Sequence, residues 1–131
     1  MATPEQNFWR LIRDHLPGHK MRVENTTGPG VPDVNGCWEG HEYWVELKIL
    51  GIKKPTTETN PWLLLDSTQR LWYTQRRDAG GKVIILVRCI NHIRFYPRLS
   101  GGYDRNIHEF IIHRPYSWSY FEMVIRNEIL R

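Results

Sequence analysis

The sequence has few cysteines and no long apolar run. Its two cysteines, Cys37 and Cys89, lie in strand-like sequence without paired metal-ligand spacing, so we expect reduced thiols in the core rather than a disulfide framework. No segment approaches the ~18 apolar residues that a membrane span needs, and the N-terminus lacks the apolar centre of a signal peptide. We therefore expect a soluble, intracellular protein of the cytoplasm.

Acidic residues are scarce in one segment of the chain. The net charge is +4, and residues 67–98 hold seven Lys and Arg but a single acid, Asp78. Residues 1–66 hold seven basic and nine acidic residues, and residues 99–131 hold four of each. A basic block suits a polyanion such as nucleic acid, because neutralised phosphates release counterions. A solvated basic face is the alternative interpretation.

The length of 131 residues and the 40% hydrophobic content fit one domain, residues 1–131, with a single core. Apolar periodicity predicts helices at residues 5–16 and after a capping box of Ser119 and Glu122. A further helix is predicted within residues 66–81, between an N-cap at Asp66 or Ser67 and a stop at two glycines. The last helix should turn Phe121, Val124, Ile125 and Ile129 inward. Strands are predicted at 19–27, 31–38, 41–49, 82–87 and 93–96, with a further candidate at 108–113. The expected fold is α/β, with helix, three strands, helix, one or two strands, helix, and a small mixed sheet flanked by helices.

A hairpin explains why acids interrupt the strands at 31–49. If Glu39-Gly40 is a two-residue loop, paired residue numbers sum to 79, and Asp33 lies opposite Glu46. Two carboxylates on one face, with Cβ atoms about 4.5–5.5 Å apart, repel each other unless a cation lies between them. Lys48 projects to that same face. The residues expected on the opposite, core-facing side are Val45, Leu47 and Ile49.

Oxygen ligands in this arrangement suit Mg²⁺ or Mn²⁺ rather than zinc. The alternative is an ordinary solvent-facing hairpin surface with mixed charges. Two short sequences favour the metal: "VPDV", followed by "WVELK", resembles the PD-(D/E)XK nuclease motif. The stretch from Arg22 to Val87, with the turn "TTGPGVPD" and the later "STQRLWYTQRRDAGGKVIILV", resembles the VRR-NUC branch of that superfamily. This branch is similar to Holliday-junction resolvases and is common in phage genomes as single-domain proteins.

The resemblance implies a restriction-endonuclease-like core and assigns roles to particular residues. It makes Asp33 and Glu46 metal ligands, with the Leu47 carbonyl as a candidate third ligand, and Lys48 the catalytic lysine. For a phage protein, the compartment is the host cytoplasm.

Two further residues match the resemblance less specifically. Glu24 corresponds to an acid on the preceding strand that binds metal or positions a metal-bound water. Gln69 corresponds to a glutamine on the following helix. Glu24 is alternatively an ordinary edge-strand acid, and Gln69 is alternatively the capping-box partner of Asp66.

These inferences predict a metal-dependent endonuclease that hydrolyses phosphodiester bonds in DNA. Phosphate contacts carry no sequence information, which favours recognition of DNA structure, such as a branch or a Holliday junction. The candidate phosphate contacts are Lys53, Lys54, Arg70, Arg76 and Arg77. The resemblance also implies a homodimer, because cutting a junction symmetrically requires two active sites. The alternatives are a catalytically silent DNA-binding module of the same fold and a restriction-type nuclease that reads a short sequence.

Overall fold

The computed structural model describes residues 1–23, 28–51, 61–98 and 109–131. Its elements follow the predicted order, except that three strands rather than one or two follow the second helix. They are α1 (Pro4–Ile12), η1 (Arg13–His15), β1 (His19–Arg22), β2 (Val34–Trp38), β3 (His41–Ile49), η3 (Pro61–Leu64), α2 (Ser67–Asp78), β4 (Val83–Arg88), β5 (His92–Tyr96), β6 (Phe110–His113) and α3 (Trp118–Leu130). Within these ranges, no helix combines the length and apolar character needed to cross a membrane.

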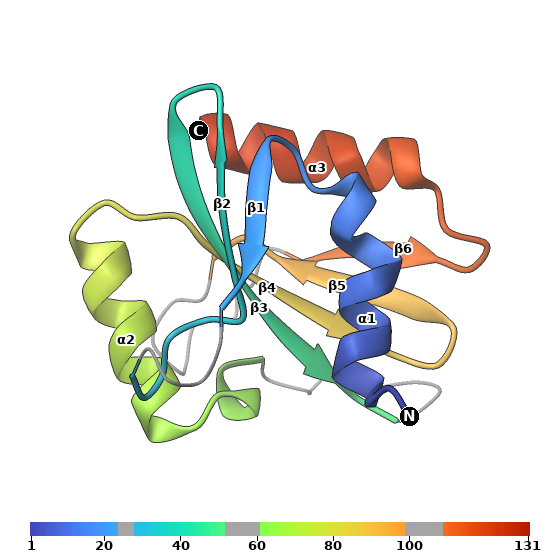
Figure 1. Ribbon diagram of the computed structural model, residues 1–131, viewed down its shortest axis with the longest axis horizontal. Coiled ribbons are helices and arrows are strands. Elements are labelled where there is room, and N and C mark those ends of the chain that lie inside the picture. Colours follow the sequence, from blue (N-terminus) through green and yellow to red (C-terminus); the bar gives the residue numbers. More distant parts are fainter. Residues whose placement is uncertain (24–27, 52–60, 99–108) are drawn as a thin grey trace.

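The described strands form one six-stranded sheet in the order β1-β2-β3-β4-β5-β6. Strands β3 and β4 are parallel, because the chain crosses over through α2 between them, and every other neighbouring pair is antiparallel. Helices α1 and α3 cover one face of the sheet and α2 lies on the other (Figure 1). The predicted α/β class, a mixed sheet flanked by helices, is confirmed.

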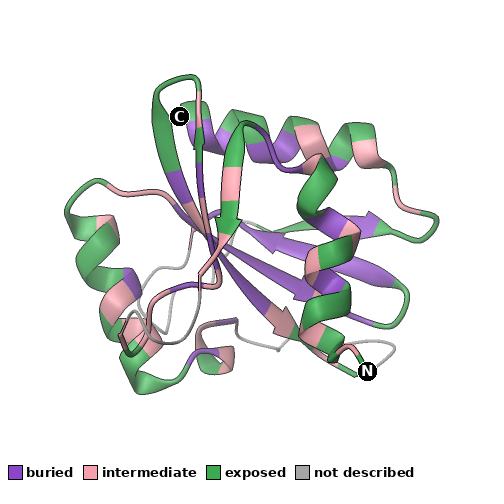
Figure 2. Cartoon of the chain, viewed as in Figure 1, coloured by how far each residue is buried: buried purple, intermediate pink, exposed green. Residues whose placement is uncertain are grey.

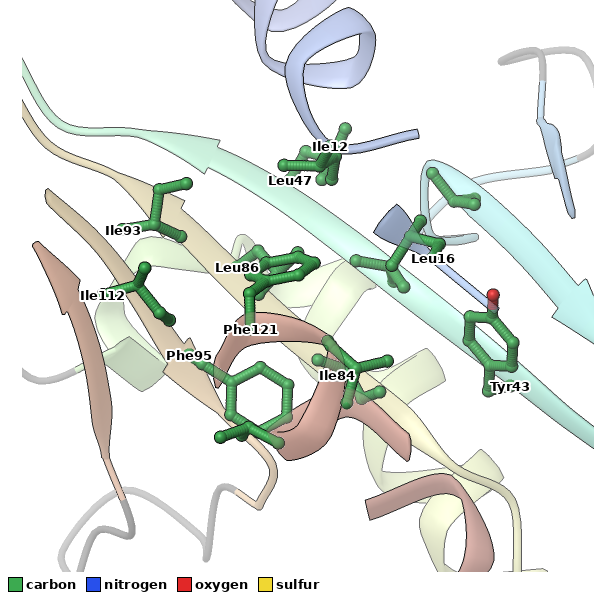
Figure 3. Close-up of a cluster of buried hydrophobic side chains, with 14 of the residues drawn as sticks. Ile12, Leu16, Tyr43, Leu47, Ile84, Leu86, Ile93, Phe95, Ile112 and Phe121 are labelled. Atoms are coloured by element: carbon green, nitrogen blue, oxygen red, sulfur yellow. The ribbon is translucent and has the colours of Figure 1, made fainter. Parts of the chain in front are cut away.

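Strand β4 is the centre of the core and is buried on both faces, as its continuous apolar run predicted (Figure 2). Ile84 and Leu86 pack under α1 and α3 with Phe121 (Figure 3). Val83 and Ile85 pack on the opposite side with residues of α2. All four residues predicted to face inward from the last helix are buried. Strand β3, the neighbour of β4, therefore lies between the two apolar layers, with α1 on one side of the sheet and α2 on the other.

Several local predictions are wrong. The strand predicted at 31–38 begins only at Val34, and the helix predicted at 5–16 ends at Ile12 and is followed by the 3₁₀ helix η1. Cys37 is exposed, because it lies near the hairpin tip, opposite the exposed Glu42; only Cys89 is a buried thiol. Ile49 is 38% exposed, because it is the last residue of β3. The last helix is not started by Ser119: its N-cap is Ser117, which makes no side-chain capping bond. The start is instead packed by Trp118, whose ring stacks on His15 with the centroids 3.9 Å apart.

The turn before Asp33 packs against the beginning of α2. Gly30 has a φ of +81°, and a Cβ there would overlap the carbonyl oxygen of Thr68. Gly40, in the hairpin loop, has a φ of +79° and nothing within 4 Å of its Cβ position. The two glycines therefore share the backbone conformation but differ in packing.

We expect Gly30→Ala to lower the melting temperature clearly more than Gly40→Ala. Both variants force alanine into the left-handed region, which costs about 1–2 kcal/mol, but only Gly30→Ala also pushes α2 away from the turn. Thermal denaturation of the two variants measures this difference. Equal losses of stability would show that the turn does not depend on its contact with α2.

Candidate active site

Asp33 and Glu46 meet, as the hairpin register predicted. Strands β2 and β3 pair Val34 with Val45 and Trp38 with His41, and one further step along this register places Asp33 opposite Glu46. Asp33 Oδ2 accepts a hydrogen bond from the Leu47 N–H at 2.8 Å, and the Asp33 side chain is also hydrogen-bonded to Glu46. The two carboxyl groups therefore lie in direct contact.

Glu46 is an acid in an apolar setting. It is only 4% exposed, and it pairs with the buried Ile85 across the parallel ladder. Burial is the main cause that raises the pKa of Glu46 to about 9, and the neighbouring Asp33 raises it further, while Lys48 opposes the shift. Two carboxyl groups in contact do not both ionise without a cation, so in the absence of one the Glu46 carboxyl holds a proton.

Lys48 and Gln69 complete a chain of polar contacts with Glu46. The Lys48 Nζ donates to Gln69 Oε1 at 2.9 Å and lies 3.8 Å from Glu46 Oε1. The Gln69 Nε2 donates to Glu46 Oε1 at 3.2 Å. The orientation of the amide follows from its partners, since its oxygen faces the ammonium group and its nitrogen faces the carboxyl oxygen. Gln69 thus connects the lysine to the acid.

Gln69 is also the capping-box residue of α2. The Asp66 N–H donates to Gln69 Oε1 at 3.0 Å, and the Gln69 N–H donates to Asp66 Oδ1 at 2.9 Å. The capping-box interpretation of Gln69 is therefore confirmed, and its role as a site residue stays a prediction. The backbone N–H of Asp66 contacts the same amide oxygen that faces Lys48, while the Asp66 carboxylate accepts a hydrogen bond from the backbone, not the side chain, of Gln69.

Glu5, in the first turn of α1, is a neighbour of the pair that sequence reasoning missed. Its side chain is hydrogen-bonded to Asp33 and forms an ion pair with Arg22 at 2.5 Å. Burial, followed by the contact with Asp33, raises the pKa of Glu5. An acid in the first turn of a helix usually indicates only a favourable interaction with the helix dipole. The packing of α1 on the sheet, which has no local sequence signal, brings Glu5 here.

Some of the other predicted site residues lie outside the described residues and some lie within them. Glu24, Lys53 and Lys54 lie outside the described residues. Leu47 is described: its side chain is 3% exposed in the core, and its N–H is occupied by Asp33. The role of its carbonyl as a metal ligand stays a prediction.

The three predicted arginine contacts on α2 are held by aromatic rings. Arg70 lies over Trp62 at 5.9 Å and its Nε donates to the Trp62 carbonyl oxygen at 3.0 Å. Arg76 lies over Trp72 at 4.6 Å, and Arg77 lies over Tyr73 at 6.0 Å. Stacking of this kind fixes a guanidinium group while leaving N–H donors at its edge. The arrangement is compatible with phosphate contacts from this helix.

The donor set of the acidic pair fits a hard divalent cation. Among the described residues, no three side chains of His, Cys, Asp or Glu stand close enough to hold a metal ion by themselves. Mg²⁺, however, is commonly held by one or two carboxylates together with waters. Asp33 and Glu46 supply two carboxylates in contact, and a cation would replace the proton that the pair holds in its absence. Glu5 contacts Asp33 and Arg22 and is a neighbour of this pair.

The sequence matches no model of a protein family, and a search of curated proteins finds no match. Among solved structures, the chain is similar to Hjc from Archaeoglobus fulgidus, a Holliday junction resolvase from an archaeal hyperthermophile. The similarity has a TM-score of 0.45 and a sequence identity of 15%, and it covers 85% of this chain and 88% of that chain.

Proposed function

We propose that the protein is a metal-dependent endonuclease that hydrolyses phosphodiester bonds in DNA. The observation that carries this proposal is the contact between two carboxyl groups, Asp33 and the buried Glu46, beside the ammonium group of Lys48. A buried carboxyl group in contact with a second one destabilises the fold when both are ionised, unless a cation lies beside them. A surface hairpin with mixed charges, the alternative from sequence, would not bury an acid to 4% exposure.

Asp33 and Glu46 would hold Mg²⁺ or Mn²⁺, with the Leu47 carbonyl and Glu24 as further candidate ligands. When bound, the ion supplies Lewis-acid polarisation of the phosphate and compensates the negative charge that develops on it. Lys48, which lies beside Glu46, orients the attacking water or donates a hydrogen bond to a phosphate oxygen as negative charge develops on it. Gln69 positions the Lys48 ammonium through its oxygen and Glu46 through its amide nitrogen.

We further propose branched DNA, such as a flap or a Holliday junction, as the preferred substrate, and a homodimer as the active form. The support is the basic segment at 67–98, whose exposed residues, such as Arg76 on α2, are placed to contact phosphates, and phosphate contacts carry no base sequence. The competing functions are a silent DNA-binding module and a restriction-type nuclease that reads a short sequence. The buried acidic pair argues against the silent module, because binding DNA alone gives no reason to place two acids in contact.

Labelled linear, flap and four-way DNA incubated with Mg²⁺ or Mn²⁺ tests the proposal directly. Cleavage that depends on the divalent ion and is faster for branched DNA is the expected result. Tight binding of all substrates without cleavage by any divalent ion favours the silent module. Cleavage confined to particular sequences in linear DNA favours the restriction-type nuclease.

The two roles of Gln69 can be separated by substitution. We expect Gln69→Glu to slow cleavage at least ~10-fold, because the glutamate cannot donate to Glu46 and places a second negative charge beside it, although it can still close the capping box. Asp66→Ala removes only the cap and is expected to cost about 0.5–2 kcal/mol of stability with cleavage nearly unchanged. Cleavage rates and melting temperatures of both variants check this. Parental activity in Gln69→Glu would reduce Gln69 to a capping residue.

The arginines of α2 provide a test of the DNA contact. We expect Arg76→Ala combined with Arg77→Ala to weaken binding about equally for all sequences, and to reduce the slope of log K against log salt by about 1 for each lost phosphate contact. The matched control is Arg10→Ala with Arg13→Ala, which removes the same charge from exposed positions on α1 and η1. Titrations at several salt concentrations measure the slopes. Identical slopes in the two double variants would remove α2 from the DNA contact.

A further inference from the structure

Three arginines from different parts of the fold converge on one buried acid, Glu128, near the end of α3. Arg77 of α2, Arg98 after β5 and Arg131 after α3 lie 3.9, 4.0 and 3.8 Å from its carboxylate oxygens. Glu128 is 5% exposed. The four side chains of this cluster, one carboxylate and three guanidinium groups, together carry a net charge of +2.

The contacts in this arginine cluster are too long for hydrogen bonds, which require about 2.7–3.2 Å. Accordingly, Glu128 Oε1 and Arg98 Nε are buried and find no hydrogen-bond partner among the described residues. A purely structural ion pair would be satisfied by one arginine in a two-pronged contact. Three guanidinium groups held near a carboxylate without bonding to it are instead arranged to receive a further anion.

A cavity of about 300 Å³ opens beside the cluster, between α3 and strands β5 and β6. Glu128 and Arg131 form part of its wall, and most of the remaining lining is apolar. Phe95 and Phe110 lie with ring centroids 5.8 Å apart in this lining, and Phe110 and Met123 are 36% and 49% exposed. A flat apolar ring therefore has room in the cavity, next to a site for an anion.

We propose that this cavity and the arginine cluster bind an unpaired nucleotide of the DNA substrate. The base lies against the partly exposed ring of Phe110, and its phosphate accepts hydrogen bonds from Arg98 and Arg131. Aromatic surfaces bind bases of any sequence, so the site recognises the absence of pairing. The choice of DNA as the ligand rests on the proposed function. Excess positive charge beside an apolar cavity matches a nucleotide, which joins a phosphate to a flat ring.

The proposed nucleotide site is separate from the Asp33 and Glu46 pair. Gln69 and Arg77 lie on the same helix, and their separation along α2 is roughly 12 Å at 1.5 Å per residue. One nucleotide does not reach both sites. The cavity therefore takes a nucleotide several positions from the scissile phosphate, or one in another arm of the branch, and this gives a preference for DNA with unpaired residues near a junction.

Binding measurements without divalent ions test the site independently of cleavage. The probes are a blunt duplex and a flap duplex whose single-stranded arm carries 2-aminopurine, and the protein is the parent chain. We expect Arg98→Gln with Arg131→Gln to bind the flap about tenfold more weakly and the blunt duplex nearly as well as the parent does. Glu128→Gln, which removes the negative charge, is expected to bind the flap more tightly. Arg10→Gln with Arg13→Gln is the charge-matched control.

Met123→Trp, at the rim, tests the cavity without changing charge. It should abolish the change in 2-aminopurine fluorescence on binding and leave the salt dependence of DNA affinity unchanged. This test remains available even if the arginine variants fold poorly. The proposal is overturned if Arg98→Gln with Arg131→Gln loses equal affinity for blunt and flap DNA, or if it has a lower melting temperature but unchanged DNA affinity. It is also overturned if Met123→Trp loses self-association rather than flap binding. If the parent never cleaves DNA but the flap still binds selectively through these residues, the nucleotide site stands and the nuclease does not.

Discussion

Lys48→Ala is expected to bind branched DNA almost as tightly as the parent protein and to cut it at least about 10²–10³-fold more slowly. Loss of one donor that stabilises charge in a transition state has an effect of this size. Lys48 is a single ammonium group among 18 basic residues, so its share of the general attraction to phosphates is small. The result would separate catalysis from binding.

The contacts of Lys48 explain why catalysis alone should suffer. Its ammonium group is held by Gln69 at 2.9 Å and lies 3.8 Å from Glu46, so it has a fixed direction beside the acids. Alanine removes that donor without removing a carboxylate that would bind the metal. The melting temperature should therefore still rise when Mg²⁺ or Mn²⁺ is added, which reports metal binding without any turnover.

Lys20→Ala is a suitable control for this measurement, because it removes the same charge from β1, where the lysine bonds to the Leu16 carbonyl oxygen. Both variants are compared on a substrate that the parent cuts, with the Asp33→Asn protein purified in parallel to exclude contaminating nuclease. If Lys48→Ala cuts as fast as the parent, the mechanism is wrong. The silent DNA-binding module then becomes the better account of the fold.

The hairpin that carries the site was predictable because its determinants are local. The Glu39-Gly40 loop sets the pairing, and both residues have positive φ, 52° and 79°, as a tight two-residue hairpin loop requires. Alternation along β3 then follows from strand geometry, which places Glu46 and Lys48 on one face. The continuous apolar run of β4 identified a strand buried on both sides for the same reason.

Features that depend on packing between distant elements were not predictable. Glu5 reaches Asp33 only because α1 packs on β3, and Arg77 reaches Glu128 only because the ends of α2 and α3 approach each other. The capping signal at Ser119 failed because the stacking of Trp118 on His15, a contact between distant segments, determines where α3 begins. Gln69 presented two rival interpretations in sequence; the structure shows the capping box with Asp66 and contacts of the same side chain with Lys48 and Glu46, and its role in catalysis stays a prediction.

Glu46→Gln and Asp33→Asn are expected to abolish cleavage, because each removes one of the two charged oxygen ligands proposed to hold the metal. The fold should remain intact, since glutamine and asparagine keep the shape of the acids and the hydrogen bond between the two positions. Full activity in either variant would remove that residue from the site. Circular dichroism and gel filtration check that the inactive proteins are folded.

In the absence of a divalent ion, Glu46→Gln should be more stable than the parent, although it is expected not to cleave DNA. Burial and Asp33 raise the pKa of Glu46 from 4.5 to about 9 in the folded protein, so between these values the folded state binds more protons than the unfolded state. The stabilisation that comes from the proton on Glu46 is therefore fully present below pH 4.5 and is lost as the pH rises through about 9. Glutamine does not ionise, so the melting temperature of Glu46→Gln should exceed that of the parent increasingly as the pH is raised from 5 to 8. Adding Mg²⁺ or Mn²⁺ should raise the melting temperature of the parent and leave that of Glu46→Gln nearly unchanged. The difference in melting temperature between the two proteins should therefore become smaller. A difference between the two proteins that is independent of both pH and divalent ions would mean that Glu46 neither holds a proton beside Asp33 nor binds a metal there.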